Sequence, residues 1–125
     1  MFKVEVTCKN DAASHSINKL LEQLPKIVAE ELNNLHGTEL ECGKGRPEGT
    51  SLRVWQCGRY ERLCLDADVE IVIMAKDFPG RSLMIDARAQ EICKRAKSLL
   101  PSSTKVYVAI WTGQAAFAQS YENPT

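Results

Sequence analysis

The fold is decided by the stretch from Val69 to Trp111, VEIVIMAKDFPGRSLMIDARAQEICKRAKSLLPSSTKVYVAIW. Its opening run, VEIVIMA, is nearly all apolar, which is typical of a central strand covered on both faces. The turn-forming residues Asp77 to Gly80 break that strand, and Ser82 is a favoured N-cap for an amphipathic helix. Pro101 ends the helix, and Val106 to Trp111 alternates as a further strand. The stretch therefore predicts a strand-helix-strand unit.

A similar unit precedes it. Apolar and polar residues alternate from Phe2 to Cys8, the period of a strand with one buried face. Apolar residues then recur at helical spacing from Ile17 to Leu35. We expect this helix to bend at Pro25, because proline deletes one backbone hydrogen bond of the helix. A closing strand is expected from Leu52 to Cys57.

Three segments fall outside these two units. Residues 42–50 are rich in glycine and predict a loop, although their order does not match the phosphate-binding pattern G-x-x-x-x-G-K-[ST]. Arg62 to Leu65 indicates a short strand. The tail from Ala115 to Thr125 indicates a terminal arm or strand.

The two units have matching spacing. Their first strands begin at Phe2 and Val69, and their helices begin near Ser14 and Ser82. The interval between the two strand starts is almost equal to the interval between the two helix starts. We interpret the chain as an internal repeat, with the glycine-rich loop inserted in the first half. Right-handed crossovers then place both helices on one face of a four-stranded sheet, in the order β-α-β-β-α-β.

The expected fold class is therefore α/β (α+β), in one domain of residues 1–125 with pseudo-repeat halves at 1–58 and 66–125. The 125-residue length suits a single core. Sixteen basic side chains balance sixteen acidic ones, so no net field attracts nucleic acid or a membrane surface. No segment has the length or apolarity of a membrane span or a signal peptide, and the cytoplasm is the expected compartment.

The five cysteines form no C-x-x-C pair and indicate reduced thiols rather than disulfides or a zinc site. We expect Cys8, Cys64 and Cys93 to be small core residues, and Cys42 and Cys57, beside glycines, to be more exposed. No cofactor or metal is expected.

A family resemblance rests on the second half. The strand Val69 to Met74, the run Gly80-Arg81-Ser82, the amphipathic helix, the strand Lys105 to Ile110 and the turn leading to Phe117 together resemble 4-oxalocrotonate tautomerase. Gly80 to Leu83 is also similar to a segment of 5-carboxymethyl-2-hydroxymuconate isomerase. The element order is shared by the ferredoxin-like fold and by the fold of the tautomerase and macrophage migration inhibitory factor superfamily. The resemblance favours the second and implies a homotrimer.

That superfamily implies a catalytic base formed by an amino-terminal proline, but here Met1 is followed by Phe2. We therefore expect the proline base to be missing. The Met1 α-amino group is a catalytic candidate in its place, because an unperturbed α-amine has a pKa of about 7.7–8.0 and can act as a base near neutral pH. A general base from a side chain is also conceivable, and the titratable candidates are Lys3, Asp66, His15 and His36.

The resemblance implies a small carboxylate ligand, with Arg81, Arg53 and Phe117 in contact with it. An arginine at a helix start opposes the helix dipole, which gives Arg81 a reason to bind an anion. Trp55 and Trp111 are expected either in the core or at a subunit interface. Three functions stay open: a tautomerase-like protein without proline chemistry, an active isomerase with another base, and a ferredoxin-like interaction module.

Overall fold

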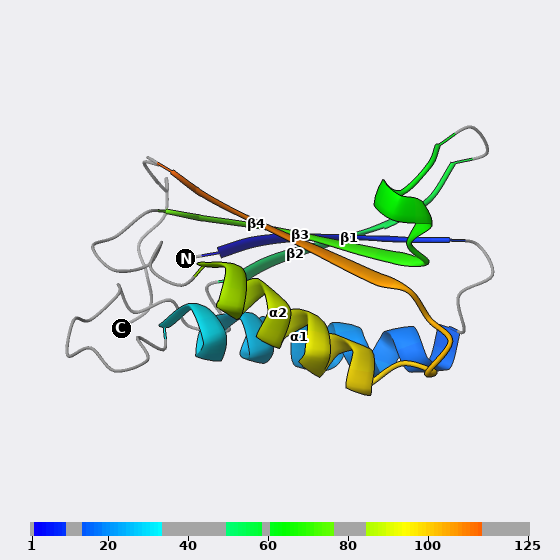
Figure 1. Ribbon diagram of the computed structural model, residues 1–125, viewed down its shortest axis with the longest axis horizontal. Helices are drawn as coiled ribbons and strands as arrows, with labels where there is room; N and C mark the ends of the chain where they lie inside the picture. The colour runs from blue at the N-terminus through cyan, green and yellow to red at the C-terminus, as the bar shows by residue number, and fades with distance from the viewer. Residues whose placement is uncertain (1, 10–13, 34–49, 59–60, 77–84, 114–125) are drawn as a thin grey trace, which may run out of the picture.

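The computed structural model describes residues 2–9, 14–33, 50–58, 61–76 and 85–113. Its elements follow the order of two β-α-β units with a short 3-10 turn between them (Figure 1). They are β1 (Phe2–Cys8), α1 (Ser14–Asn33), β2 (Thr50–Gln56), η2 (Cys64–Asp66), β3 (Val69–Lys76), α2 (Ile85–Ser98) and β4 (Val106–Gly113).

The four strands form one sheet in the order β2-β1-β3-β4. Each unit contributes a directly paired parallel couple, β1 with β2 and β3 with β4, and the two couples meet through the antiparallel pair β1–β3. The middle of that pair is Glu5 opposite Val72. A ferredoxin-like sheet is instead a split β-α-β arrangement, in which the two strands of a unit do not pair directly. The ferredoxin-like alternative is therefore wrong.

Both helices cover the same face of the sheet, as predicted (Figure 1). Alternate residues of β1 and β3 point into this layer and are buried, because successive side chains of a strand point to opposite faces. The helices close the layer with their apolar faces. The core includes Phe2, Val4, Val6, Val69, Ile71, Ile73, Leu20, Leu24, Val28, Leu32, Ile92 and Ala96.

In the described part of the chain no α-helix covers the opposite face of the sheet, which we call the open face (Figure 1). The strand register assigns to it Lys3, Glu5, Thr7, Ser51, Arg53, Trp55, Glu70, Val72, Met74, Tyr107, Ala109 and Trp111. Trp55 and Trp111 are 52% and 66% exposed, so the expectation that they fill the core is wrong. The expectation that β3 is covered on both faces is also wrong within one chain, because Val72 and Met74 are only half-buried.

The predicted strand from Arg62 to Leu65 is wrong as well. This segment leads into the 3-10 turn η2, which projects from the open-face side of the sheet (Figure 1). Alternating leucines imitated a strand, but only Leu63 is buried, whereas Leu65 is 84% exposed in the left-handed region, with φ 54° and ψ 31°. Cys64 is also exposed, which contradicts its assignment to the core.

Among the other cysteines, Cys8 is buried as expected, and burial raises the pKa of its thiol. Cys57 and Cys93 are half-buried, and all four described cysteines are free thiols. Cys42 and the glycine-rich loop lie outside the described residues, as do Gly37, Ser82 and the tail beyond Gly113. No helix in the described part of the chain is long and apolar enough to cross a membrane.

Helix α1 runs from Ser14 to Asn33 through Pro25 without interruption. Its apolar stripe explains this continuity, since Leu24, Val28 and Leu32 are completely buried on either side of the proline. Tertiary packing of an amphipathic face supplies most of the stability of a helix in a protein, so burial compensates for the hydrogen bond that Pro25 deletes.

Candidate functional site

Several segment ends meet at one end of the sheet, which we call the Phe2 edge. β1 begins there at Phe2, opposite Thr50 at the start of β2 and Ala75 near the end of β3. The last residues of β3 and β4, Lys76 and Gly113, also pair there. The end of α1 and the start of α2 lie at the same end, at the left of Figure 1.

Three of the four predicted site residues lie outside the described residues: Met1, Arg81 and Phe117. The chain segments that contain them are attached at the Phe2 edge. Met1 precedes Phe2, Arg81 lies between Lys76 and Ile85, and Phe117 follows Gly113. The topology therefore brings the points of attachment of these three residues to one edge, although nothing is shown of their side chains.

Arg53, the fourth predicted residue, is exposed near the middle of β2, where it pairs with Glu5 on the open face. It lies three residues beyond Thr50 along the strand, or about 10 Å at the usual rise per residue. Within the described residues its guanidinium makes no ion pair. The structure therefore does not bring Arg53 to the Phe2 edge of its own chain.

The side-chain bases considered from the sequence are dispersed. Lys3 is exposed on the open face, next to the Phe2 edge. Asp66 lies in η2 at the opposite end of the sheet, where Arg62 Nε is 4.0 Å from its carboxylate. His15 lies in the first turn of α1, also at the opposite end, and His36 lies outside the described residues. Among the described residues, Lys3 is therefore the one candidate base near the Phe2 edge, and no other candidate base lies beside it.

A buried cation near the Phe2 edge was not predicted from the sequence. Arg88, in the first turns of α2, is only 2% exposed, and its Nη1 donates a hydrogen bond of 3.2 Å to the carbonyl oxygen of Leu32. Leu32 is the penultimate residue of α1. The signal was available, because Arg88 is three residues after Ile85 and four before Ile92, on the apolar stripe of the helix.

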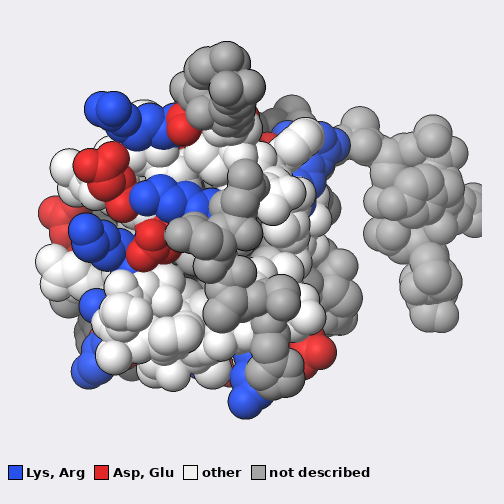
Figure 2. Space-filling model, turned by 90° about the vertical axis from the view of Figure 1, so that its right-hand side faces the viewer, with Lys and Arg blue, Asp and Glu red and all other residues white. Residues whose placement is uncertain are grey.

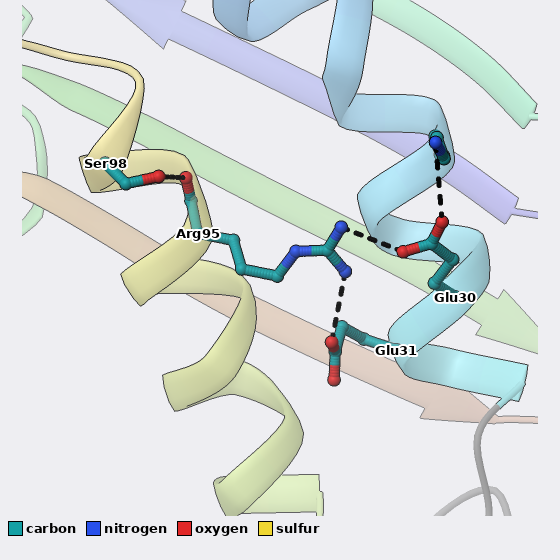
Figure 3. A network of polar contacts seen from close by, with 5 residues as sticks. Glu30, Glu31, Arg95 and Ser98 are labelled. Carbon is teal, nitrogen blue, oxygen red and sulfur yellow. Dashed lines mark hydrogen bonds and ion pairs between the residues drawn. The ribbon is translucent and has the colours of Figure 1, made fainter.

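A second arginine joins the helices two turns further along α2. Arg95 lies between two carboxylates of α1, with Nη2 2.8 Å from Glu30 Oε2 and Nη1 3.1 Å from Glu31 Oε1 (Figure 3). The pKa of Arg95 is raised, chiefly by its hydrogen bond to Glu30. Glu31 is 8% exposed, and its Oε2 has no hydrogen-bond partner among the described residues. The guanidinium of Arg95 therefore balances the charge of this buried carboxylate.

Arg95 also borders a groove between the two helices, with a volume of about 440 Å³. Since both carboxylates already engage its guanidinium, this arginine is a poor receptor for a further anion. The groove is lined by Lys19, Glu22, Gln23, Ile27, Arg95, Ser98 and Leu99.

At the end opposite the Phe2 edge, three polar side chains meet on the open face. The backbone N–H of Cys64 donates a 3.0 Å hydrogen bond to Glu70 Oε2, and Glu70 pairs with Tyr107 in the sheet. The pKa of Tyr107 is raised, first by its hydrogen-bonding and charge interactions with the Cys64 side chain, next by desolvation and last by the charge of Glu70. Basic and acidic side chains are interspersed over this end of the molecule (Figure 2).

Comparison with solved structures identifies the fold. The chain has the fold of the tautomerase and macrophage migration inhibitory factor superfamily, which confirms the resemblance at the level of fold. The sequence itself matches no family model and no curated protein.

Three solved structures illustrate the likeness. Malonate semialdehyde decarboxylase aligns with a TM-score of 0.60 at 10% identity, over 94% of this chain and 92% of that chain. A fused 4-OT, described as an asymmetric trimer, gives 0.59 at 13% identity over the same shares, 94% and 92%. The macrophage migration inhibitory factor-like protein of Entamoeba histolytica gives 0.57 at 13% identity, over 97% of this chain and 95% of that chain.

Proposed function

We propose that this protein is a tautomerase-like homotrimer that lacks the proline base and binds a small carboxylate metabolite, rather than a classical tautomerase. The observation that carries the proposal is the superfamily fold, which extends over 94% of the chain in the comparison with malonate semialdehyde decarboxylase. Its topology supports a ligand site at the Phe2 edge, where the segments containing Met1, Arg81 and Phe117 are attached. The whole chain then acts as one domain.

The start of β1 supports the absence of proline chemistry. Phe2 is the first residue of β1, is 2% exposed and belongs to the core, and Met1 precedes it. Neither position holds the secondary amine that the superfamily base requires. In this proposal the protein recognises a carboxylate through arginine, whose planar guanidinium forms paired hydrogen bonds with both carboxylate oxygens.

The open face supports self-association. It exposes Trp55 and Trp111 and also carries the half-buried apolar side chains of Val72 and Met74. Apolar patches at a protein surface mark interaction sites. One structural relative, the fused 4-OT, is described as a trimer. In a trimer, Arg53 of one subunit would serve the Phe2 edge of its neighbour, which reconciles the position of Arg53 with a role in ligand binding.

Ligand binding is tested by titrating the protein with phenylenolpyruvate, a carboxylate enol, by calorimetry. We expect saturable binding that weakens by about tenfold or more in Arg81→Ala and in Arg53→Ala, since loss of a charged hydrogen bond costs about 1.5–3 kcal/mol. Arg62→Ala is the matched control, because Arg62 is exposed at the opposite end of the sheet. Binding that is equal in all three variants would refute the arginine assignments.

An active isomerase that uses the Met1 amine is the second candidate, because the amine is attached at the same edge as Arg81. Following ketonisation of phenylenolpyruvate distinguishes the two functions. Turnover above background that disappears when the amino terminus is extended would favour the enzyme. Binding without turnover favours the first proposal.

We place the protein in the cytoplasm, with no nucleic acid or membrane as partner. The free thiols of the described cysteines agree with that reducing compartment.

A further inference from the structure

The short turn η2 holds two neighbouring residues in a backbone conformation that is unfavourable for them. Leu65 and Asp66 both have a φ of 54°, and in the described part of the chain no other residue except glycine has a positive φ. The left-handed region brings a Cβ atom close to the following carbonyl oxygen, so this conformation is strained. Such strain persists only where surrounding contacts fix the backbone, and it is typical of segments that switch or bind.

The side chains of η2 supply little packing that would compensate for this strain. Leu65 is 84% exposed, and Cys64 and Asp66 are exposed as well. Arg62 Nε lies 4.0 Å from the carboxylate of Asp66, but both side chains are exposed, and ion pairs of this kind contribute little to stability. The conformation of the turn therefore depends on its backbone and on its two ends.

The two ends of η2 are anchored. Leu63 before the turn and Ala67 after it are 6% and 3% exposed. Two backbone hydrogen bonds close the turn, from the Asp66 N–H to the Leu63 carbonyl at 3.2 Å and from the Ala67 N–H to the Cys64 carbonyl at 3.1 Å. The strained residues are thus held between two buried positions.

A charged hydrogen bond attaches the turn to the sheet. The Cys64 N–H donates to Oε2 of Glu70 at 3.0 Å, and Glu70 lies on the open face of β3. The Cys64 side chain also interacts with Tyr107, the neighbour of Glu70 on β4. A carboxylate is a stronger acceptor than a neutral group. Glu70 therefore holds η2, which projects from the open-face side, over the end of that face formed by Glu70 and Tyr107 (Figure 1).

We propose that η2 is a lid over this end of the open face, held shut by the Glu70 carboxylate and favoured to open by the strain at Leu65 and Asp66. The lid opens as a local unit while the sheet stays folded, because neither the turn nor its two anchors belong to the main core. In the open form, Glu70 and Tyr107 join the surface that the open face offers to a partner. The lid depends neither on the ligand nor on the trimer proposed above.

Hydrogen exchange of the backbone amides under native conditions, followed by NMR, tests the lid. The three lid amides are those of Cys64, Asp66 and Ala67, each of which donates a hydrogen bond that opening breaks. After correction for intrinsic rates, we expect them to exchange at least about a hundredfold faster than the amides of Ile71 and Ile73 in the middle of β3, because local opening costs less than global unfolding.

Glu70→Gln tests the carboxylate that holds the lid shut. Glutamine keeps the shape of the side chain but replaces a charged acceptor with a neutral one, so the lid amides should exchange about tenfold faster than in the parent. The amides of β3 should keep their rates. Glu22→Gln is the matched control, because Glu22 is exposed on α1, and it should change none of these rates.

Leu65→Gly should have the opposite effect. Glycine removes the strain from the closed turn, so the lid amides are expected to exchange several-fold more slowly than in the parent. Lid amides that exchange as slowly as those of β3 in the parent would overturn the proposal, because η2 would then open only when the whole sheet unfolds. Equal rates in the parent and in Glu70→Gln would also overturn it, whether or not the protein binds a carboxylate.

Discussion

Tyr107 and Cys64 come from segments far apart in sequence and meet at the end of the sheet opposite the Phe2 edge. Interaction with Cys64, followed by desolvation and the charge of Glu70, raises the pKa of the Tyr107 phenol above its ordinary value. We expect Cys64→Ala to lower the pKa of Tyr107 toward the usual value of about 10, since it removes the largest cause. An ultraviolet titration of each protein, minus that of its Tyr107→Phe derivative, measures this change.

The same shift fixes how stability depends on pH. A phenol whose pKa is higher in the folded than in the unfolded chain binds its proton more tightly when folded. Its stabilising contribution is therefore fully present below the unfolded pKa and is lost as the pH rises through the folded pKa.

Cys93→Ala is the control for the titration of Tyr107, because the Cys93 thiol donates to the backbone carbonyl oxygen of Val106. If Cys64→Ala leaves the titration unchanged, the assigned cause is wrong.

Leu65 is a residue whose backbone conformation suits glycine better than leucine. Its φ of 54° places it in the left-handed region, and its side chain is 84% exposed, so little packing compensates for the strain. That conformation costs a residue with a Cβ atom about 1–2 kcal/mol, part of which glycine returns through its more flexible unfolded state. We expect Leu65→Gly to raise the free energy of unfolding by up to about 1 kcal/mol.

Urea denaturation measures the effect of Leu65→Gly, and Leu65→Ala is its matched control. Alanine removes the exposed leucine side chain but keeps the Cβ atom that causes the strain. A gain in stability that is equal in the two variants would show that the leucine side chain, and not the backbone conformation, is responsible.

At the scale of elements, α1 contains Pro25 in its interior, where any other residue would donate a backbone hydrogen bond. Pro25 lacks the N–H that would donate to the carbonyl of Leu21, and its ring crowds the preceding turn. Because the helix already runs continuously to Asn33, we expect Pro25→Ala to raise the free energy of unfolding by about 1–3 kcal/mol. Chemical denaturation checks this, with Gln23→Ala on the exposed side of α1 as the control. A Pro25→Ala protein no more stable than that control would contradict the expectation.

Most elements of this fold could be predicted from periodicity. β1 and the two helices follow apolar patterns whose period matches the observed burial, as in Phe2, Val4 and Val6. The segment 62–65 misled the prediction because two leucines spaced by one residue match a strand, whereas only long-range contacts decide which leucine is buried. Strand order also depends on pairing between distant segments. It was the family resemblance, and not the pattern, that favoured the correct order.

The candidate site was less predictable. The points of attachment of Met1, Arg81 and Phe117 at one edge follow from the predicted topology. Arg53 lies elsewhere because register and strand length, which patterns define poorly, determine how far a residue is from the edge. Arg88 was not predicted because a cation on the apolar stripe of a helix does not reveal from sequence alone which group would balance its charge. Only the tertiary structure supplies the Leu32 carbonyl that makes its burial favourable.

At the scale of the whole molecule, the open face determines how the chain associates. Val72 lies at its middle, between Glu5 and Ala109, and does not belong to the main core. We expect the parent to have a molar mass three times that of the 13.9 kDa chain. Val72→Arg should give the mass of one chain, because a charge buried at an apolar interface is costly. Light scattering measures the mass.

Tryptophan fluorescence gives an independent measurement of this association. Trp55 and Trp111 are exposed in the single chain, so their emission should shift to shorter wavelength when the parent associates and return in Val72→Arg. Gln90→Arg introduces the same side chain on the exposed surface of α2 and should leave both mass and emission unchanged. A parent with the mass of one chain would contradict the trimer.

The antiparallel pair β1–β3 has a final consequence for how the chain can be divided. Each half contributes one strand to this pair and one helix to the α1–α2 contact. The two halves are therefore held together by noncovalent contacts and do not depend on the connection between Gln56 and Val69. The connection mainly supplies a high local concentration of one half near the other. Two polypeptides separated within it are expected to reassemble when mixed, which makes this chain suitable for fragment complementation.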